Sequence, residues 1–456
     1  MAKVLLISTY ELGHQPFGLA SPAAWLNDAG ADVATLDLAI ESIEKDLVAQ
    51  SDLIAIYLPM HTATRLAADL IPQIRQINAA AHLCCYGLYA PTNETFLRGL
   101  GVQTIIGGEF ETGLVYLYHQ LKDAEELRPG QAQPLVSMER QQFLVPERNS
   151  LPNLEAYAHL ILPDGQNRTT GYTETTRGCK HTCRHCPIVP IYNGRFRIIQ
   201  QEIVLADVRQ QVKAGAQHIT FGDPDFLNGP GHSMPIVQAL NAEFPDLTYD
   251  VTIKVEHLLK LNELLPTLKD TGCIFITSAV EAVDDGILEI LDKGHTRAGF
   301  EKAASNLREL GLVLNPTFVA FTPWTTREGY LEFLKVIGDL DLVSHISPIQ
   351  YAIRLLIPAG SRLLELSEVQ NLVEPYDHAA LCYPWQHPDP VMDQLYTHIF
   401  RLIQSNQVNQ ESRISLFNDV WRATLDLTGI VDPNLSADQG WELAAAPVPR
   451  MSESWY

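Results

Sequence analysis

Short apolar runs, which are typical of buried strands, alternate along this chain with longer segments whose apolar residues recur at helical spacing. Within residues 1–125, strands are predicted over residues 4–9, 33–38, 53–58, 82–86 and 104–106, and helices over residues 22–29 and 62–78. Strands that alternate with helices of ~10–15 residues predict a doubly wound parallel sheet. Ligands of such sheets bind beyond the carboxyl ends of the strands.

The same alternation returns between residues 171 and 360. The predicted strands there are residues 173–177, 218–221, 247–253, 274–280, 313–321 and 346–351. Helices are predicted between them over residues 202–214, 235–244, 258–270, 287–291, 300–310 and 328–337. Six strands with intervening helices predict a (β/α)6 partial barrel, whose site should lie at the carboxyl ends of the strands.

The remaining segments complete a predicted α/β protein. Residues 126–170 are expected to link the two units, because residues 129–134 are rich in Pro, Gly and Gln. Residues 361–456 are expected to be helical, with helices near residues 391–404 and 412–427. The proline-rich end, residues 447–456, is expected to be mobile.

Composition narrows the classes of function. The 456 residues carry a net charge of −22, and no run of Lys or Arg provides the basic surface that nucleic acids require. No apolar run reaches the ~18 residues that would span a bilayer. The N-terminus lacks a secretory cleavage site, and an odd number of cysteines does not suggest disulfides. We therefore expect a cytoplasmic protein that binds neither nucleic acid nor membrane.

The strongest chemical signal is a C-x3-C-x2-C spacing formed by Cys179, Cys183 and Cys186. Three thiolates on one loop can hold three irons of a cubane [4Fe–4S] cluster. No fourth cysteine follows at a suitable spacing, so one iron would stay open to a substrate or cofactor. Structural zinc bound with His181 or His185 is an alternative, as is a closed electron-transfer cluster. Zinc sites, however, usually pair two separated C-x2-C halves.

This spacing resembles the signature of the radical S-adenosylmethionine (SAM) enzymes. The resemblance implies that the open iron binds the amino and carboxylate groups of SAM, and that the reduced cluster cleaves a C–S bond to release a carbon radical. Many members carry an aromatic residue just before the last cysteine, where this chain has His185.

Two strand ends offer candidate SAM-binding residues. The stretch that contains Gly222, Asp223 and Asp225 resembles the glycine-rich motif of the family. Gly222 would allow close backbone approach, and one of the two aspartates would pair with the SAM ammonium; a solvated acidic turn is the alternative. After the third predicted barrel strand, Lys254 and Glu256 could form an ion pair or contact the SAM carboxylate or ribose.

Later strand ends add three candidates. Ser278 and Glu281, together with residues 292–296, resemble the G-x-E-S and N-K-G-x-T pair of cobalamin-type radical SAM enzymes, which implies a position near the ribose hydroxyls. Arg354 could bind a carboxylate of SAM or of an amino-acid substrate, and a structural salt bridge is equally open. No catalytic residue is assigned beyond the cluster ligands.

The N-terminal layout is similar to the cobalamin-binding domain that precedes the barrel in one large subclass. The resemblance implies that a corrinoid tail enters the sheet near Gly107 and Gly108, with His14, Met60 and Gly87 at neighbouring strand ends. The D-x-H-x-x-G loop of some cobalamin proteins is missing, although His14 lies in the corresponding loop. A domain that binds nothing and only packs on the barrel is the alternative. A dinucleotide is not indicated, because no G-x-G-x-x-G occurs.

The whole chain also resembles the radical SAM proteins, some of them selenoproteins, named for a C-terminal Cys/Sec-Cys/Ala-Glu-Pro tail. The stretches that carry this resemblance are residues 8–14, 222–226 and 455–456. The sequence stops before such a tail, and we expect that a selenocysteine codon read as a stop removed it.

These observations predict a radical SAM enzyme that acts on a small molecule and receives electrons from a flavodoxin- or ferredoxin-type reductant. Cobalamin-assisted transfer of a methyl group or other carbon fragment is the first hypothesis. Transfer of the aminocarboxypropyl part of SAM to sulfur, selenium or arsenic is the second, since the chain is also similar to enzymes that modify arsenic in this way. A non-enzymatic cobalamin or metal sensor is the third.

Overall fold

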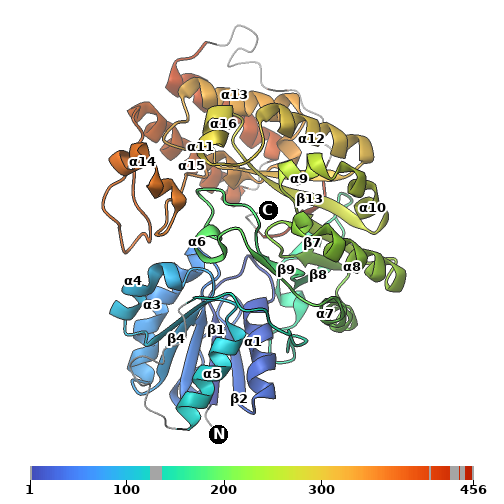
Figure 1. Cartoon of the computed structure of the whole chain (residues 1–456). Helices are drawn as coiled ribbons and strands as arrows, with labels where there is room; N and C mark the ends of the chain where they lie inside the picture. Colours follow the sequence, from blue (N-terminus) through green and yellow to red (C-terminus); the bar gives the residue numbers. More distant parts are fainter. Residues whose placement is uncertain (1–2, 124–135, 410–411, 432–440, 442–446, 454–456) are drawn as a thin grey trace.

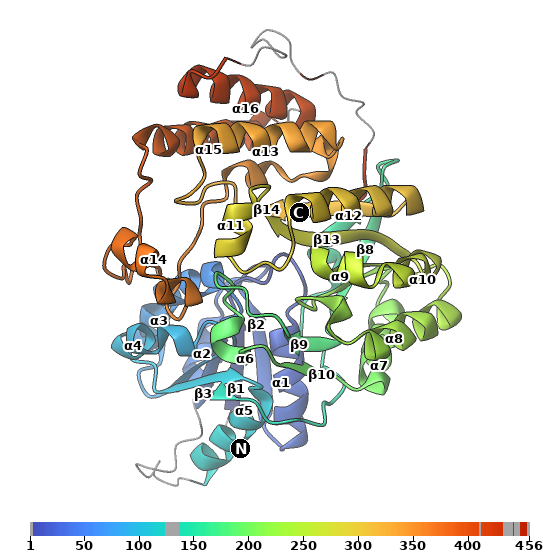
Figure 2. The same ribbon diagram turned by 45° about the horizontal axis from the view of Figure 1, so that its top comes forward.

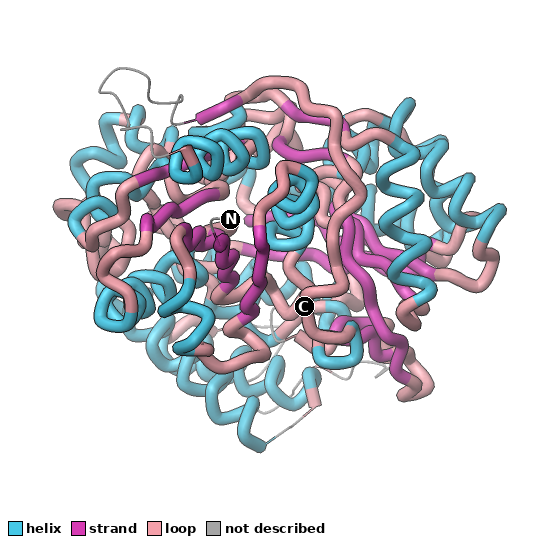
Figure 3. The backbone as a smooth tube through the Cα atoms, turned by 90° about the horizontal axis from the view of Figure 1, so that it is seen from below, coloured by secondary structure: helices cyan, strands magenta, loops and turns pink. Residues whose placement is uncertain are grey.

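The computed structural model describes residues 3–123, 136–409, 412–431, 441 and 447–453. Its blue N-terminal part is a parallel sheet with helices on both faces, and a second, curled sheet and a helical C-terminal region follow (Figure 1). Viewed from below, the strands of both sheets run through the interior and the helices lie around them (Figure 3). The predicted α/β fold class is therefore confirmed.

The N-terminal sheet has the strand order β2-β1-β3-β4-β5-β6, and all its strands are parallel. This order is flavodoxin-like and places its switch point next to β1. Helices α1 and α5 cover one face and α2, α3 and α4 the other, each through an apolar cluster. The strands are β1 Lys3–Ser8, β2 Asp32–Asp37, β3 Leu53–Tyr57, β4 His82–Tyr86, β5 Thr104–Gly108 and β6 Val136–Ser137. The helices are α1 Phe17–Asp28, α2 Lys45–Gln50, α3 His61–Ile77, α4 Glu94–Gly99 and α5 Glu111–Lys122.

The second sheet has the order β14-β13-β12-β11-β8-β7-β15, in which β8 to β14 are parallel. Strands β7 and β15 extend one edge in antiparallel pairing. The strands are β7 His159–Ile161, β8 Asn167–Thr173, β11 His218–Phe221, β12 Thr248–Thr252, β13 Cys273–Glu281, β14 Val313–Phe318 and β15 Arg450–Met451. A separate two-stranded ribbon pairs β9 Thr176–Gly178 with β10 Phe196–Ile198.

Helices between these strands bury apolar faces against the sheet in the largest apolar cluster of the protein. The helices in this cluster are α7 Gln201–Lys213, α8 Pro230–Glu243, α9 Val255–Lys260, α10 Leu265–Asp270, α12 Arg297–Leu310 and α13 Arg327–Asp339. Two further helices, α6 Val189–Tyr192 and α11 Asp285–Ile290, lie outside it, and α11 packs in a separate apolar cluster. Thr296 and Thr326 cap α12 and α13 by accepting backbone N–H groups, as polar residues at helix starts do.

The barrel is less complete than the sequence predicts. Residues 346–351 do not form a sixth strand; the chain there makes the 3-10 turns Val343–His345 and Pro348–Ala352. Pro348 has no N–H to give to a strand ladder, and only an isolated bridge joins Phe321 to Arg354. At the other end, the first parallel strand is β8 rather than residues 173–177. Because the sequence of β8 is polar, most of this strand was assigned to the predicted linker. Strand β6 also lies in that predicted linker, and it pairs with the N-terminal sheet.

The C-terminal region contains α14 Ser367–Leu372, α15 Pro390–Asn409 and α16 Arg413–Thr428. Figure 2 shows α13, α15 and α16 lying side by side over the curled sheet. Across the described ranges, no helix combines the length and apolarity needed to cross a membrane.

The end of the chain is ordered where the sequence predicts mobility. Strand β15 pairs with β7, and Tyr10 donates a hydrogen bond to Glu453 at 3.0 Å. Met451 is buried in a small apolar cluster with Leu160 and Phe275. The expectation of a mobile end is therefore wrong for residues 447–453. The predicted connector at residues 129–134 and residues 455–456 lie outside the described residues.

The packing of Met451 gives a first prediction. Met451→Ala should lower the free energy of unfolding by about 2–4 kcal/mol, because it leaves a cavity under β7 and β15. Arg450→Ala, on the exposed neighbouring position, should change it by less than about 0.5 kcal/mol. Denaturant unfolding of the three proteins measures both values, and equal effects would show that the end of the chain is not docked.

Candidate functional site

The three spaced cysteines lie on the loop that joins β9 to α6. Cys179 and Cys183 are buried and Cys186 is partly buried. Burial raises the pKa of Cys186 to about 12, and the thiols of Cys183 and Cys179 add to the shift, so the three sulfurs lie within electrostatic range of one another. Three thiols on one loop are the donor set that a [4Fe–4S] cluster with one open iron requires, and the residues fit that group.

Contacts from later parts of the chain fix this loop. The Asn228 side chain accepts a hydrogen bond from Lys180 N at 3.3 Å and donates to Gly178 O at 3.4 Å. Arg184 N donates to Leu291 O at 3.0 Å, and the Ser361 hydroxyl donates to Arg184 O at the same distance. The backbone of the loop is therefore held independently of the cysteine side chains.

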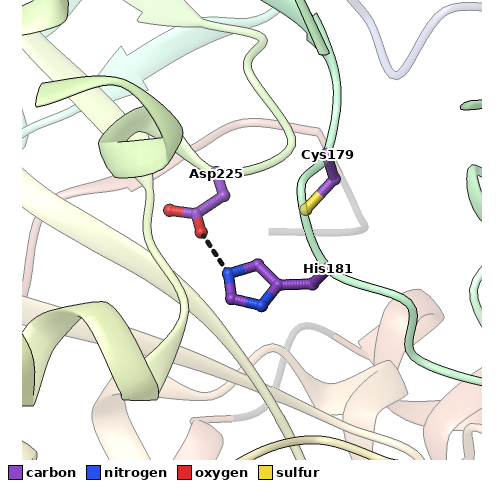
Figure 4. Close-up of side chains that lie close together, drawn as sticks. All are labelled: Cys179, His181 and Asp225. Carbon is purple, nitrogen blue, oxygen red and sulfur yellow. Dashed lines mark ion pairs between the residues drawn. The ribbon is translucent and has the colours of Figure 1, made fainter. Parts of the chain in front are cut away.

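Two histidines flank Asp225 close to Cys179, and Figure 4 shows one of them, His181, with Asp225 and Cys179. Oδ2 of Asp225 lies 2.6 Å from Nδ1 of His257 and 3.5 Å from Nε2 of His181. Burial acts to raise the pKa of Asp225, but the hydrogen bonds and charges of the two histidines outweigh it and hold this pKa below its usual value. The other ring nitrogen of His181 lies 3.6 Å from Glu256, so both ring nitrogens face carboxylates. Ligand atoms of Cys179, His181 and Asp225 also lie within 4.8 Å of one another, a spacing that could hold a metal ion.

Asp223 plays a different part from Asp225. It accepts hydrogen bonds from Thr175 N at 2.8 Å and from the Thr175 and Thr176 hydroxyls at 2.6 Å. These hydrogen bonds hold the loop after β11 against the start of β9, so Asp223 stabilises the position of this loop. Gly222 is required here, because a Cβ atom would lie 1.8 Å from the hydroxyl oxygen of Tyr172.

Lys254 and Glu256 form the weak ion pair that the sequence left open, with Nζ and Oε2 3.7 Å apart. The same Lys254 ammonium group also donates to Sγ of Cys183 at 3.5 Å. This contact to one of the three spaced cysteines was not predicted.

Glu281 ends β13 in a left-handed conformation, with φ = +70°, which is unusual for a residue with a side chain. Its Oε1 lies 3.2 Å from Nζ of Lys293 and 3.1 Å from Nε2 of His185. Burial would raise the pKa of Glu281, but Lys293 and His185 lower it well below its usual range. Nearby in sequence, the buried hydroxyl of Ser278 has no hydrogen-bond partner among the described residues, so it can serve a ligand.

Arg354 has the structural role that was its alternative assignment. Its guanidinium lies 2.6 Å from Asp393 and 3.8 Å from the ring centre of Trp385, and it donates to Trp385 O at 2.9 Å. These contacts attach the end of the barrel to the C-terminal region.

A cavity of about 300 Å³ lies between the carboxyl ends of the two sheets. The N-terminal domain contributes residues that follow β1, β3, β4 and β5, among them Glu11, His14, Met60, Gly108 and Phe110. The barrel contributes residues of and after β8, β9, β11 and β12, among them Tyr172, Glu174, Arg177, Gly222 and Asp223. Gly222 and Asp223 of the predicted SAM residues therefore share this cavity with predicted cobalamin residues. The three cysteines and the other predicted SAM residues, Asp225, Lys254, Glu256, Ser278, Glu281 and Arg354, do not line it.

Only some of the residues expected to contact a corrinoid line the cavity. His14, Met60 and Gly108 line the cavity, and burial lowers the pKa of His14 to about 4, so its imidazole is neutral. Gly107 and Gly87 instead pack within the domain: added Cβ atoms would lie 2.2 Å from Pro91 and 3.0 Å from Tyr57. A Cβ on Gly108 would also lie 2.0 Å from Ser137 O, so packing within the chain itself accounts for the Gly-Gly pair.

A buried ion cluster joins the two domains beside this cavity. Arg177 on β9 lies 2.8 Å from both Glu111 and Glu174 and 3.6 Å from Glu109. Burial raises the pKa of Glu109 to about 7, although Arg177 opposes the shift. The guanidinium is also surrounded by the rings of Phe17, Phe110 and Phe143.

Several of these residues were not identified from sequence. Asn228 and His257 stand three and one positions after predicted site residues, and Lys293 lies within a stretch already noted, so proximity to the motifs was the available signal. No signal in the sequence pointed to Arg177, because two of its glutamate partners are on the other domain.

The sequence profile of the radical SAM superfamily matches residues 173–334. These residues form a radical SAM domain. The match covers the cysteine loop, Asp225, Lys254 and Glu281, and this domain implies a [4Fe–4S] cluster and SAM as cofactors.

Relatives of this enzyme are distant. A protein of Methanocaldococcus jannaschii with the name "putative methylthiotransferase" is 23% identical over 66% of this chain and 68% of its own length. The tRNA-2-methylthio-N(6)-dimethylallyladenosine synthase of Herpetosiphon aurantiacus is 25% identical over 36% of this chain and 39% of its own length.

Among solved structures, the cobalamin-dependent SAM radical enzyme OxsB, with aqua-cobalamin and SAM bound, has a TM-score of 0.72 and 16% identity. The match covers 94% of this chain and 70% of OxsB. At these identities the likeness shows the fold, which here extends over both domains.

Glu109 gives a prediction for pH dependence. In the folded protein its carboxyl stays protonated up to a pKa of about 7, whereas in the unfolded chain it ionises near its usual pKa of 4.5, so it lowers stability as pH rises between these values. Glu109→Gln should remove this loss of stability. Relative to wild type, its free energy of unfolding should rise by about 3 kcal/mol between about pH 4 and pH 8. Denaturant unfolding across this range measures the gain, and the exposed variant Glu263→Gln should not reproduce it.

Proposed function

We propose that this enzyme uses SAM to transfer a methyl group or another carbon fragment to a small molecule held in the cavity between its two domains, with a corrinoid as a second cofactor. The observation that carries the proposal is the single cavity in which the strand ends of the N-terminal sheet meet those of the radical SAM domain. The net charge of −22 favours a small-molecule substrate over a nucleic acid.

Named residues would hold the cluster and SAM. Cys179, Cys183 and Cys186 would each bind one iron, and the Asp225 carboxylate would pair with the SAM ammonium. Ser278, whose buried hydroxyl has no partner in the described part of the chain, would bond a ribose hydroxyl. When bound, the cluster and SAM supply the carbon radical that begins the reaction.

The protein's part is to orient these groups and exclude water. The left-handed backbone of Glu281 is stabilised by its buried pairing with Lys293 and His185, which fixes the end of β13 beside the cysteine loop. Aromatic side chains wall the cavity, among them Phe110, Tyr172 and Phe221. Such walls protect a reactive radical from solvent.

The cavity lining favours a substrate with a cationic group. Glu11 lines it, whereas Glu174 and Asp223, also in the lining, are already bonded to Arg177 and to Thr175 and Thr176. The only guanidinium in the lining, that of Arg177, is paired with Glu111 and Glu174. Glu11 Oε2 is buried without a hydrogen-bond partner among the described residues, and burial and Glu174 raise the Glu11 pKa well above its usual value. A cation beside Glu11 would satisfy this carboxylate.

A corrinoid would lie against His14, Met60 and Gly108. Support comes from the position of the cavity at the carboxyl ends of parallel strands, where such sheets bind ligands, and from the fold shared with OxsB. Neutral imidazole, the form of His14, is a common metal ligand. When bound, a corrinoid supplies a carrier for the transferred group. The cavity is at the lower end of ligand-pocket volumes, so binding requires side chains such as Tyr57 and Tyr172 to move.

The products of SAM cleavage test the proposed reaction. Anaerobically reconstituted, reduced enzyme should convert SAM to 5′-deoxyadenosine, and added cobalamin should bind in a stoichiometric amount. If 5′-methylthioadenosine forms instead, the aminocarboxypropyl transfer considered from sequence replaces the proposal. Cofactor binding without any SAM cleavage would indicate a sensor module.

The cluster assignment has its own test. Cys183→Ala should lose the brown visible absorbance, the bound iron and sulfide, and all SAM cleavage, because one iron of the cubane loses its only protein ligand. Cys382→Ala, a partly buried cysteine of the C-terminal region, should retain all three. Iron and sulfide analysis with visible spectroscopy measures the difference, and a brown, iron-loaded Cys183→Ala protein would contradict the assignment.

A further inference from the structure

The side chain of Lys254 is placed against a cluster ligand rather than in solvent. It precedes helix α9, is 7% exposed, and donates from Nζ to Sγ of Cys183 at 3.5 Å. A buried ammonium group is costly unless a negative partner compensates it. A cysteine that coordinates iron is a thiolate, so the cluster itself would provide that partner.

Lys254 has no strong competing carboxylate. Glu256 lies 3.7 Å from Lys254 but 2.6 Å from the exposed Lys260, and it also faces His181. The other buried lysine near the loop, Lys293, is paired with Glu281 at 3.2 Å. The charge of Lys254 is therefore the less neutralised of the two.

We propose that Lys254 sets the reduction potential of the [4Fe–4S] cluster through its contact with Cys183. Reduction adds one negative charge to the cluster, and a fixed positive charge beside a coordinating sulfur stabilises the reduced form more than the oxidised form. Hydrogen bonds to the sulfurs and local charge are recognised determinants of such potentials. This role differs from the SAM contact expected for Lys254 from the sequence.

The chain offers a matched control for a test. Lys254 and Lys260 lie at opposite ends of the short helix α9 and share Glu256, but Lys260 is 68% exposed and bonds only to that carboxylate among the contacts described. Substituting each by Gln removes the same charge at nearly the same place in the chain. Only one substitution removes a donor from a cluster sulfur, and Lys254→Arg keeps both the charge and a donor.

The measurement is an anaerobic redox titration of the reconstituted proteins, followed by electron paramagnetic resonance, without SAM, substrate or corrinoid. Lys254→Gln should lower the midpoint potential of the cluster. At a fixed potential the ratio of reduced to oxidised cluster should fall about tenfold, which corresponds to a shift of about 59 mV in the midpoint of a one-electron couple. Lys254→Arg should stay near wild type, and Lys260→Gln should not change.

Three results would overturn the proposal. The first is a Lys254→Gln potential equal to wild type, including the case in which only its affinity for SAM falls, since that would restore the sequence-based role. The second is a shift in Lys260→Gln as large as that in Lys254→Gln. The third is loss of the cluster in Lys254→Gln but not in Lys254→Arg, which would make Lys254 a requirement for holding the cluster. None of these results depends on the transfer reaction, which the SAM cleavage products test separately.

Discussion

One buried guanidinium, that of Arg177, fixes the geometry of the whole molecule. It lies on β9, immediately before the cysteine loop, and it pairs with Glu109 and Glu111 where β5 of the other sheet leads into α5. Removing a charge from water is tolerable only with close partners, so the two strand ends must stay together. The carboxyl ends of both sheets face one cavity because of this constraint. Burial raises the pKa of Glu109, and neighbouring Glu111 adds to the shift, although Arg177 opposes it.

The sequence predicted those parts of the fold in which local pattern and tertiary packing agree. Apolar runs identified the strands of both sheets, because buried parallel strands are apolar on both faces. The prediction failed in two places. Residues 346–351 have the apolar pattern of a strand, but Pro348 has no N–H group to donate to a neighbouring strand. Strand β8 was missed because its sequence is polar and lacks an apolar run. Strand β15 could not be predicted either, since its stability comes from β7, almost three hundred residues earlier in the chain.

The candidate site was likewise predicted only where the local sequence determines the arrangement. The cysteine spacing was informative because all three ligands lie on one loop, and so was the acidic motif, although sequence alone could not separate Asp223 from Asp225. That separation depends on the partners each finds in space: two threonines for Asp223 and two histidines for Asp225. Arg354 shows the converse, since its strand-end position suggested a ligand but Asp393 and Trp385 occupy its guanidinium.

The charges around the site are arranged in two opposed sets. Buried lysines, Lys254 and Lys293, lie at the cysteine loop, whereas carboxyl groups such as Glu11 and Glu174 line the cavity. A cluster held by three thiolates would be negative, and SAM carries a sulfonium and an ammonium, so under the proposed function each set would face a group of opposite charge. Asp225 lies next to the loop, where the two sets meet, and its histidine partners keep it ionised despite burial. The same low dielectric that makes each unpaired group costly would, under the proposed function, favour a cationic ligand beside an anionic cluster.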